Sequence, residues 1–163
     1  MTRPMHIGVD VGYRKIAVSC PEAGWVSSID FKPRKSMSRR EEIIKLTSFM
    51  ADVTKMMFID KPSWSYMAIV EAPVVAGARN LQSTIKVAKT VGLVETLLAP
   101  HVSDIHAVAV SSWKSKVVGH GHASKEDVVT WVDAHLPEMT GLCSGSQDLY
   151  DATCIALYGE TLD

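Results

Sequence analysis

Four acidic residues are the side chains of this sequence best suited to chemistry, because their positions would let them act together. Asp10 and Glu71 each close a short apolar run, whereas Asp148 and Asp151 lie three apart in a helix-like segment and so share one helix face. Carboxylates gathered in one place repel one another unless a cation neutralises them, and a divalent cation does this best. The spacing therefore suggests a hydrolytic metal site.

Strands must position the first two acids. Three strand-like segments open the chain and predict an antiparallel meander, at residues 6–11, 16–20 and 25–31. Residues 66–71 predict a buried strand, and the helical segment before it permits a crossover that makes it parallel to the first strand. Asp10 and Glu71 would then be adjacent.

Helices account for most of the remaining chain. Ser38 and Glu41 form a capping box that begins a helix reaching about Met57, and Ser124 caps another. The other expected elements are a helix over 81–99, a strand over 105–110 and a helix over 147–158. The side chains expected to face the core from the first two helices are Ile43, Ile44, Leu46, Phe49, Met50, Val53, Ile85, Ala88, Gly92 and Val94. The order predicts an α/β fold with a mixed five-stranded sheet and helices on both faces.

The bulk properties limit the class of protein. The 163 residues predict a single domain, 1–163, with 47% hydrophobic and 21% charged residues, as in a soluble globular protein. Apolar runs stay short of a membrane span, and the first residues lack a signal peptide, so we expect a cytoplasmic protein that does not enter a membrane. The three cysteines form no CxxC motif, which argues against a disulfide framework and a zinc knuckle.

Each local feature also has a simpler interpretation. Asp10 and Gly12 could form an ordinary turn or the phosphate loop of an actin-like ATPase, and Glu71 could be a plain strand-end residue. The basic residues at positions 32–40 could be a solvated loop or a phosphate-contacting patch. His120 and His122 could suggest zinc, but two ligands do not make a site, and a turn is favoured.

Four motifs together resemble the RuvC family of Holliday junction resolvases. They are Ile7-Gly-Val-Asp-Val-Gly-Tyr-Arg14, Ala68-Ile-Val-Glu71, the segment from Trp113 to Lys125, and Asp148-Leu-Tyr-Asp-Ala152. They occur in the family's order over nearly the whole chain. The resemblance implies a ribonuclease H-like fold, a homodimer, and Mg²⁺-dependent cleavage of four-way DNA junctions that leaves 5′-phosphates. A branch-migration motor is a typical partner of the family's cellular members.

The resemblance also implies roles for individual residues. The catalytic carboxylates and metal ligands would be Asp10, Glu71, Asp148 and Asp151. They would hold two Mg²⁺ ions per site, which Mn²⁺ can replace; one ion would activate water and the other would stabilise the leaving 3′-oxygen. Lys114 would compensate charge in catalysis. The expected DNA-binding residues are Lys125, Arg79, Arg14 and Lys116.

The chain departs from the family after Glu71, where an aromatic residue often wedges between bases. Val74 or Val75 stands there instead, so we expect cleavage of flaps and forks as well as four-way junctions. This departure would fit a viral or mobile-element member. The helix over 81–99, with small residues Ala88, Gly92 and Ala99, is a plausible dimer interface. The alternatives are a YqgF-like nuclease acting on RNA and a catalytically silent protein that binds branched DNA.

Overall fold

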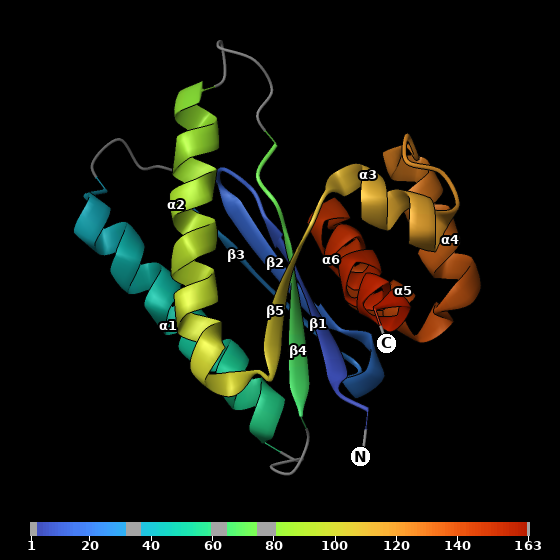
Figure 1. Ribbon diagram of the computed structural model, residues 1–163, viewed down its shortest axis with the longest axis horizontal. Coiled ribbons are helices and arrows are strands. Elements are labelled where there is room, and N and C mark those ends of the chain that lie inside the picture. The colour runs from blue at the N-terminus through green and yellow to red at the C-terminus, as the bar shows by residue number, and fades with distance from the viewer. Residues whose placement is uncertain (1–2, 32–36, 60–64, 75–80, 163) are drawn as a thin grey trace.

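One mixed sheet organises the protein. The computed structural model describes residues 3–31, 37–59, 65–74 and 81–162. The five strands lie in the order β3-β2-β1-β4-β5 (Figure 1). Their bounds are Met5–Val11 for β1, Lys15–Cys20 for β2, Trp25–Asp30 for β3, Tyr66–Glu71 for β4 and Asp104–Val108 for β5. The first three strands are antiparallel, whereas β4 and β5 run parallel to β1, so the predicted mixed sheet is confirmed.

Helices cover both faces of this sheet, as expected (Figure 1). One face carries α1 and α2, and the other carries the helices of the C-terminal third. The helices are α1 (Arg39–Phe58), α2 (Leu81–Leu98), α3 (Val110–Trp113), α4 (Lys125–His135), α5 (Pro137–Cys143) and α6 (Gln147–Tyr158). A π-helical turn, Lys114–Val118, follows α3 directly. Among the described residues, no helix is both long and apolar enough to cross a membrane.

Strand alternation decides which side chains face which helices. In β1, Ile7, Val9 and Val11 belong to the core shared with α1 and α2. Successive side chains of a strand point to opposite faces. Gly8 and Asp10 therefore face α6, as do the alternate residues of the neighbouring strands. This alternation sets the surroundings of every acid described below.

Several local predictions are confirmed. The capping box of Ser38 and Glu41 forms, and Ser124 caps its helix as predicted, there also as a box with Asp127. The strand over 66–71 and the helix over 147–158 have the predicted bounds. Strong local signals account for this agreement, because a cap or an uninterrupted apolar run specifies its element without long-range help.

Some core assignments are wrong. Ile43, Ile44, Ile85, Ala88 and Gly92 do not face the core; the first three are exposed large apolar side chains, and the other two are exposed as well. In α2, Ile85, Ala88 and Gly92 lie on a different side of the helix from the buried Val91, Val94 and Leu98, whereas Val87 of the same region packs against the core. The buried residues of these two helices are Leu46, Phe49, Met50, Val53, Met57, Val91, Val94 and Leu98.

One boundary after β4 also differs from the prediction. The strand expected over 105–110 ends at Val108, because Val110 already begins α3. Farther along, Pro137 occupies the first turn of α5, where its missing N–H costs nothing.

Gly8 allows α6 to lie directly on β1. A Cβ atom at this position would lie 2.0 Å from the carbonyl oxygen of Ala152 and 2.3 Å from the backbone nitrogen of Ala156. Both contacts are backbone atoms, so no rotamer change could relieve them. Ser19 on β2 and Thr153 on α6 form a buried hydrogen bond of 2.8 Å beside this contact. The missing side chain therefore sets the depth at which α6 docks.

We predict that Gly8→Ala destabilises the protein by about 2 kcal/mol or more, because overpacking against backbone forces the helix outward. Gly141→Ala is the matched control. Gly141 lies in a helix, and a Cβ atom there meets nothing within 4 Å, so this change should be neutral or slightly stabilising. Urea unfolding of the three proteins measures the difference. Equal stability of the two variants would contradict the close contact.

Candidate active site

Asp10 and Glu71 lie at the same end of two neighbouring strands. The register of the parallel pair β1 and β4 places Val9 opposite Val70, so the two acids follow at equivalent positions. Alternation along each strand turns both side chains toward the face that α6 covers. The predicted adjacency of these two residues is confirmed, and its cause is the parallel crossover.

Asp148 and Asp151 come from the first turns of α6, which packs across β1. Asp148 Oδ2 lies 2.9 Å from Lys15 Nζ, and Lys15 belongs to β2. Asp151 Oδ1 accepts a hydrogen bond of 2.9 Å from Gln147 Nε2. The helix thus delivers two carboxylates to the strand ends, and each already has a polar partner.

Glu71 is held by a residue from the segment after β5. Its Oε2 accepts a hydrogen bond of 2.9 Å from the indole Nε1 of Trp113, the last residue of α3. Trp113 is almost fully buried, so the bond fixes Glu71 from inside the protein. A buried indole N–H needs such a partner, and the pair therefore stabilises both groups.

The charges of the four acids act on one another. Burial raises the pKa of Asp10 to about 8, with further contributions from the carboxylates of Glu71, Asp151 and Asp148, while Lys15 opposes the rise. Burial also raises the pKa of Glu71 and of Asp151, and Asp151 adds to the rise at Glu71. The acids of β1, β4 and the first turns of α6 therefore lie in one region, where α6 packs against both strands.

The donor set fits a hard divalent cation. All four side chains offer oxygen atoms, and a bound cation would relieve their repulsion. Within the described part of the chain, no three histidine, cysteine, aspartate or glutamate side chains form a ready-made metal cage. Trp113, Lys15 and Gln147 hold three of the acids, so the carboxylates form a coupled cluster whose oxygens are directed partly to protein partners.

Two predicted lysines lie at the edge of this cluster. Lys114 Nζ donates a hydrogen bond of 2.6 Å to the carbonyl oxygen of Ala123, and its charge opposes the rise in the pKa of Glu71 and of Asp151. Lys125 is the exposed first residue of α4, and its charge also opposes the rise in the pKa of Asp151. Both cations therefore act on the carboxylate cluster from one side.

The remaining predicted DNA contacts are less well defined. Arg14 is exposed in the turn between β1 and β2, with its guanidinium carbon 5.8 Å from the centre of the Tyr13 ring. Lys116 is exposed in the π-helical turn. Arg79 and Val75 lie outside the described residues, and Val74 is 59% exposed.

His120, one of the two histidines that could suggest zinc, pairs with an acid at the surface. Its Nε2 lies 3.8 Å from Asp127 Oδ2.

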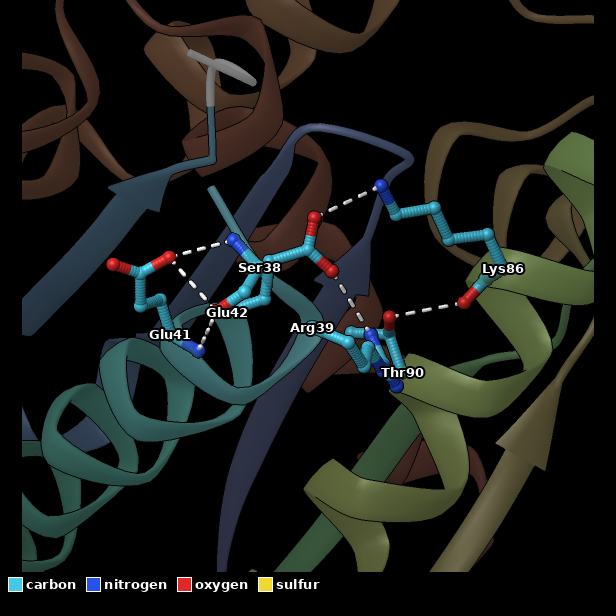
Figure 2. A network of polar contacts seen from close by, with 6 residues as sticks. All are labelled: Ser38, Arg39, Glu41, Glu42, Lys86 and Thr90. Carbon is cyan, nitrogen blue, oxygen red and sulfur yellow. Dashed lines mark hydrogen bonds and ion pairs between the residues drawn. The ribbon is translucent and has the colours of Figure 1, made fainter. Parts of the chain in front are cut away.

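A polar network joins the beginnings of α1 and α2 (Figure 2). Glu42 accepts hydrogen bonds from Arg39 at 3.1 Å and from Lys86 at 3.2 Å. Lys86 Nζ also lies 4.8 Å from the centre of the Tyr13 ring, in the turn that follows β1. Arg39 is thus paired with Glu42 of its own helix, while the basic residues Lys32, Arg34 and Lys35 lie outside the described residues.

Sequence reasoning missed the residues that hold the acids. Lys15, Trp113 and Gln147 each contact one carboxylate, and Gly8 admits the helix that carries two of them. A signal existed for Lys15, because a lysine that begins a strand of otherwise buried residues needs an anionic partner. The partner itself is 133 residues away and could not be named from the sequence.

We predict that Asp10→Asn stabilises the metal-free protein, increasingly so as the pH rises from about 4 to about 8. The folded state keeps a proton on Asp10 up to about pH 8, whereas the unfolded chain releases it near 3.8. Wild-type stability therefore falls as pH rises through this window, and the asparagine removes that loss. Thermal unfolding in EDTA should show a gain of at least about 2 kcal/mol at pH 8. A difference in stability between the two proteins that does not change with pH would contradict the raised pKa of Asp10.

Comparison with known proteins identifies the family. The model of the family "Crossover junction endodeoxyribonuclease RuvC" matches residues 7–158. Thermus thermophilus RuvC superposes with a TM-score of 0.66 at 20% identity, over 95% of each chain. The same organism's RuvC in complex with a Holliday junction substrate gives a TM-score of 0.68 at 18% identity, over 98% of this chain and 96% of that one. No curated protein sequence matches.

The structural matches support the expected ribonuclease H-like fold. The family match extends from the strand that carries Asp10 to the end of the helix that carries Asp148 and Asp151, so it includes all four acids of the cluster. Nucleases of this family depend on divalent metal ions, which agrees with an all-oxygen donor set. The chain belongs to the RuvC family and is a crossover junction endodeoxyribonuclease.

Proposed function

We propose that this protein is a single nuclease domain, residues 1–163, that cuts four-way DNA junctions by metal-assisted phosphodiester hydrolysis and leaves 5′-phosphate ends. The observation that carries the proposal is the placement of Asp10 beside Glu71 at the ends of β1 and β4, under the helix that carries Asp148 and Asp151; burial, with added repulsion from these three acids, raises the pKa of Asp10 to about 8. Buried carboxylates that repel one another lower the stability of the fold, and such groups are typical of functional sites, here one that binds a cation. The junction-bound RuvC neighbour supports the choice of substrate.

The four carboxylates would hold two Mg²⁺ ions, which Mn²⁺ could replace. The bound ions would supply an activated water and stabilise the leaving oxygen. Trp113 orients Glu71, and Gln147 orients Asp151. These hydrogen bonds restrict the rotamers of both acids before substrate binds. Their protein partners therefore contribute preorganisation rather than chemistry.

The cations at the edge of the cluster would contact the DNA. Lys114 acts electrostatically on two of the acids, so a scissile phosphate placed against them would also lie within reach of its charge. Lys125, Arg14, Lys116 and Arg79 would contact phosphates farther along the backbone, which gives affinity without sequence preference. The exposed Val74 offers an apolar contact but no stacking, which supports action on flaps and forks in addition to four-way junctions.

A cleavage assay with Asp10→Asn tests the proposed activity. The variant should cut a labelled four-way junction at least about a hundredfold more slowly in Mg²⁺, because metal assistance contributes several kcal/mol to such reactions. Asp52→Asn is the matched control, since Asp52 is a well-exposed acid on α1 that pairs with Lys55 at 3.2 Å. It should cut like the wild type.

Further substrates separate the alternatives. Flaps and forks should be cut by the wild type, whereas intact duplex should be spared. Faster cutting of structured RNA would favour the YqgF-like alternative. Junction binding without cutting in Mg²⁺ or Mn²⁺ would favour the silent DNA-binding protein. Equal cutting by wild type and Asp10→Asn would exclude the proposed site.

We also propose a homodimer that uses the outer face of α2. Leu81, Ile85, Ala88 and Gly92 are exposed and recur at helical spacing on one side of the helix. A Cβ atom on Gly92 would meet nothing within 4 Å, so a second helix could approach closely there. A two-fold assembly suits a junction, since two strands of like polarity must be cut symmetrically.

We predict that Gly92→Arg converts the dimer to a monomer, because a long charged side chain would separate the two helices. Size-exclusion chromatography with light scattering measures the mass. Gly141→Arg is the control; it places the same side chain at another exposed helical glycine, on α5, and should leave the mass unchanged. A wild-type monomer at micromolar concentration would contradict the proposed dimer.

A further inference from the structure

Lys15 is a cation built into the carboxylate cluster. It begins β2, and its side chain points toward α6. Its ammonium donates a hydrogen bond of 2.8 Å to Ser146 Oγ and lies 2.9 Å from Asp148 Oδ2. Its positive charge also acts on Asp10. One lysine therefore contacts the beginning of α6 and compensates charge on acids from two elements.

The contact differs from an ordinary surface ion pair. The Lys15 side chain is only 31% exposed, and the Asp148 side chain is 41% exposed. Ser146 supplies a second anchor, one residue before the first turn of the helix. The ammonium is thus held between a strand and a helix, and it contacts one of the two oxygens through which Asp148 could bind a metal.

A lysine and a divalent cation would compete for this carboxylate. Each neutralises the same negative charge, and placing both beside Asp148 would bring two positive charges together. When a metal ion binds, Asp148 must weaken its contact with Lys15, whereas Ser146 can continue to hold the ammonium. The serine therefore allows the exchange without expelling the lysine from the site.

We propose that Lys15 is a resident counter-ion that holds Asp148 in the metal-free protein and competes with the divalent cation for it. The proposal rests on the proposed function, in that the carboxylates must bind metal. Lys15 then acts as a positioning residue. It stabilises the empty cluster and raises the metal concentration at which the site fills.

The test measures metal binding and metal-free stability of Lys15→Met. Isothermal titration with Mn²⁺, in the absence of DNA, should show binding about two- to fivefold tighter than in the wild type, the size expected for a partly exposed ion pair. In EDTA, the variant should unfold at a lower temperature. Saturating Mn²⁺ should reduce this difference, because the metal then supplies the missing charge.

Three further proteins make the result specific. Lys55→Met removes the lysine of the exposed pair with Asp52. It should change neither the affinity for Mn²⁺ nor the effect of Mn²⁺ on the unfolding temperature. Lys15→Arg keeps the charge and should bind Mn²⁺ within about twofold of the wild type. In an Asp148→Asn background, Lys15→Met should have a smaller effect on metal-free stability than in the wild type, because the paired group is absent.

The outcomes separate this proposal from the proposed function. Wild-type protein that binds Mn²⁺ while Lys15→Met binds it equally or more weakly would overturn the role of Lys15 and leave the metal site intact. General damage to the fold would weaken binding, so it cannot imitate the expected tightening. A wild type that binds no Mn²⁺ would overturn the metal site itself. Unchanged metal affinity with weaker junction binding in Ca²⁺ would assign Lys15 to a DNA phosphate and overturn the proposal.

Discussion

Repulsion among four carboxylates is the constraint on which the active site depends. Asp10 bears it most directly, since burial and three acidic neighbours raise its pKa to about 8. The free energy that offsets this repulsion comes from the rest of the fold, because apolar packing on both faces of the sheet keeps the strand ends and α6 in place. The protein thus retains an arrangement that lowers its own stability, as active sites often do.

The two faces of the sheet support this arrangement in different ways. The face that carries α1 and α2 provides an apolar core, and Glu42 of α1 links the two helices through Lys86 of α2 (Figure 2). The opposite face carries the four acids, because α6 packs closely against β1 and its first turns hold Asp148 and Asp151. That closeness depends on Gly8. The outer side of α2 remains available for a second copy of the chain.

Three acids of the cluster are each held by a different kind of partner. A buried indole holds Glu71, an amide on the same helix holds Asp151, and an ammonium holds Asp148. Two further lysines approach from the segment between β5 and α4. The neutral donors restrict the rotation of their carboxylates and do not compete with a metal ion for the negative charge. The ammonium restricts rotation and also competes for that charge. The site is therefore prepared for cations before any bind.

The sequence by itself determined most elements and the identity of the four acids. Capping boxes at Ser38 and Ser124 and the apolar run before Glu71 are local signals, and the motifs around the acids carry the family resemblance. Helix faces were harder to predict, because Ile85, an apolar residue predicted to face the core, is 45% exposed. Only the tertiary structure decided the partners of the acids and the docking of α6 on Gly8. The contacts of Lys15 with Asp148 and of Gly8 with Ala152 join residues more than 130 positions apart. The pattern of residues along a chain carries no information about which distant side chain will fill a given space.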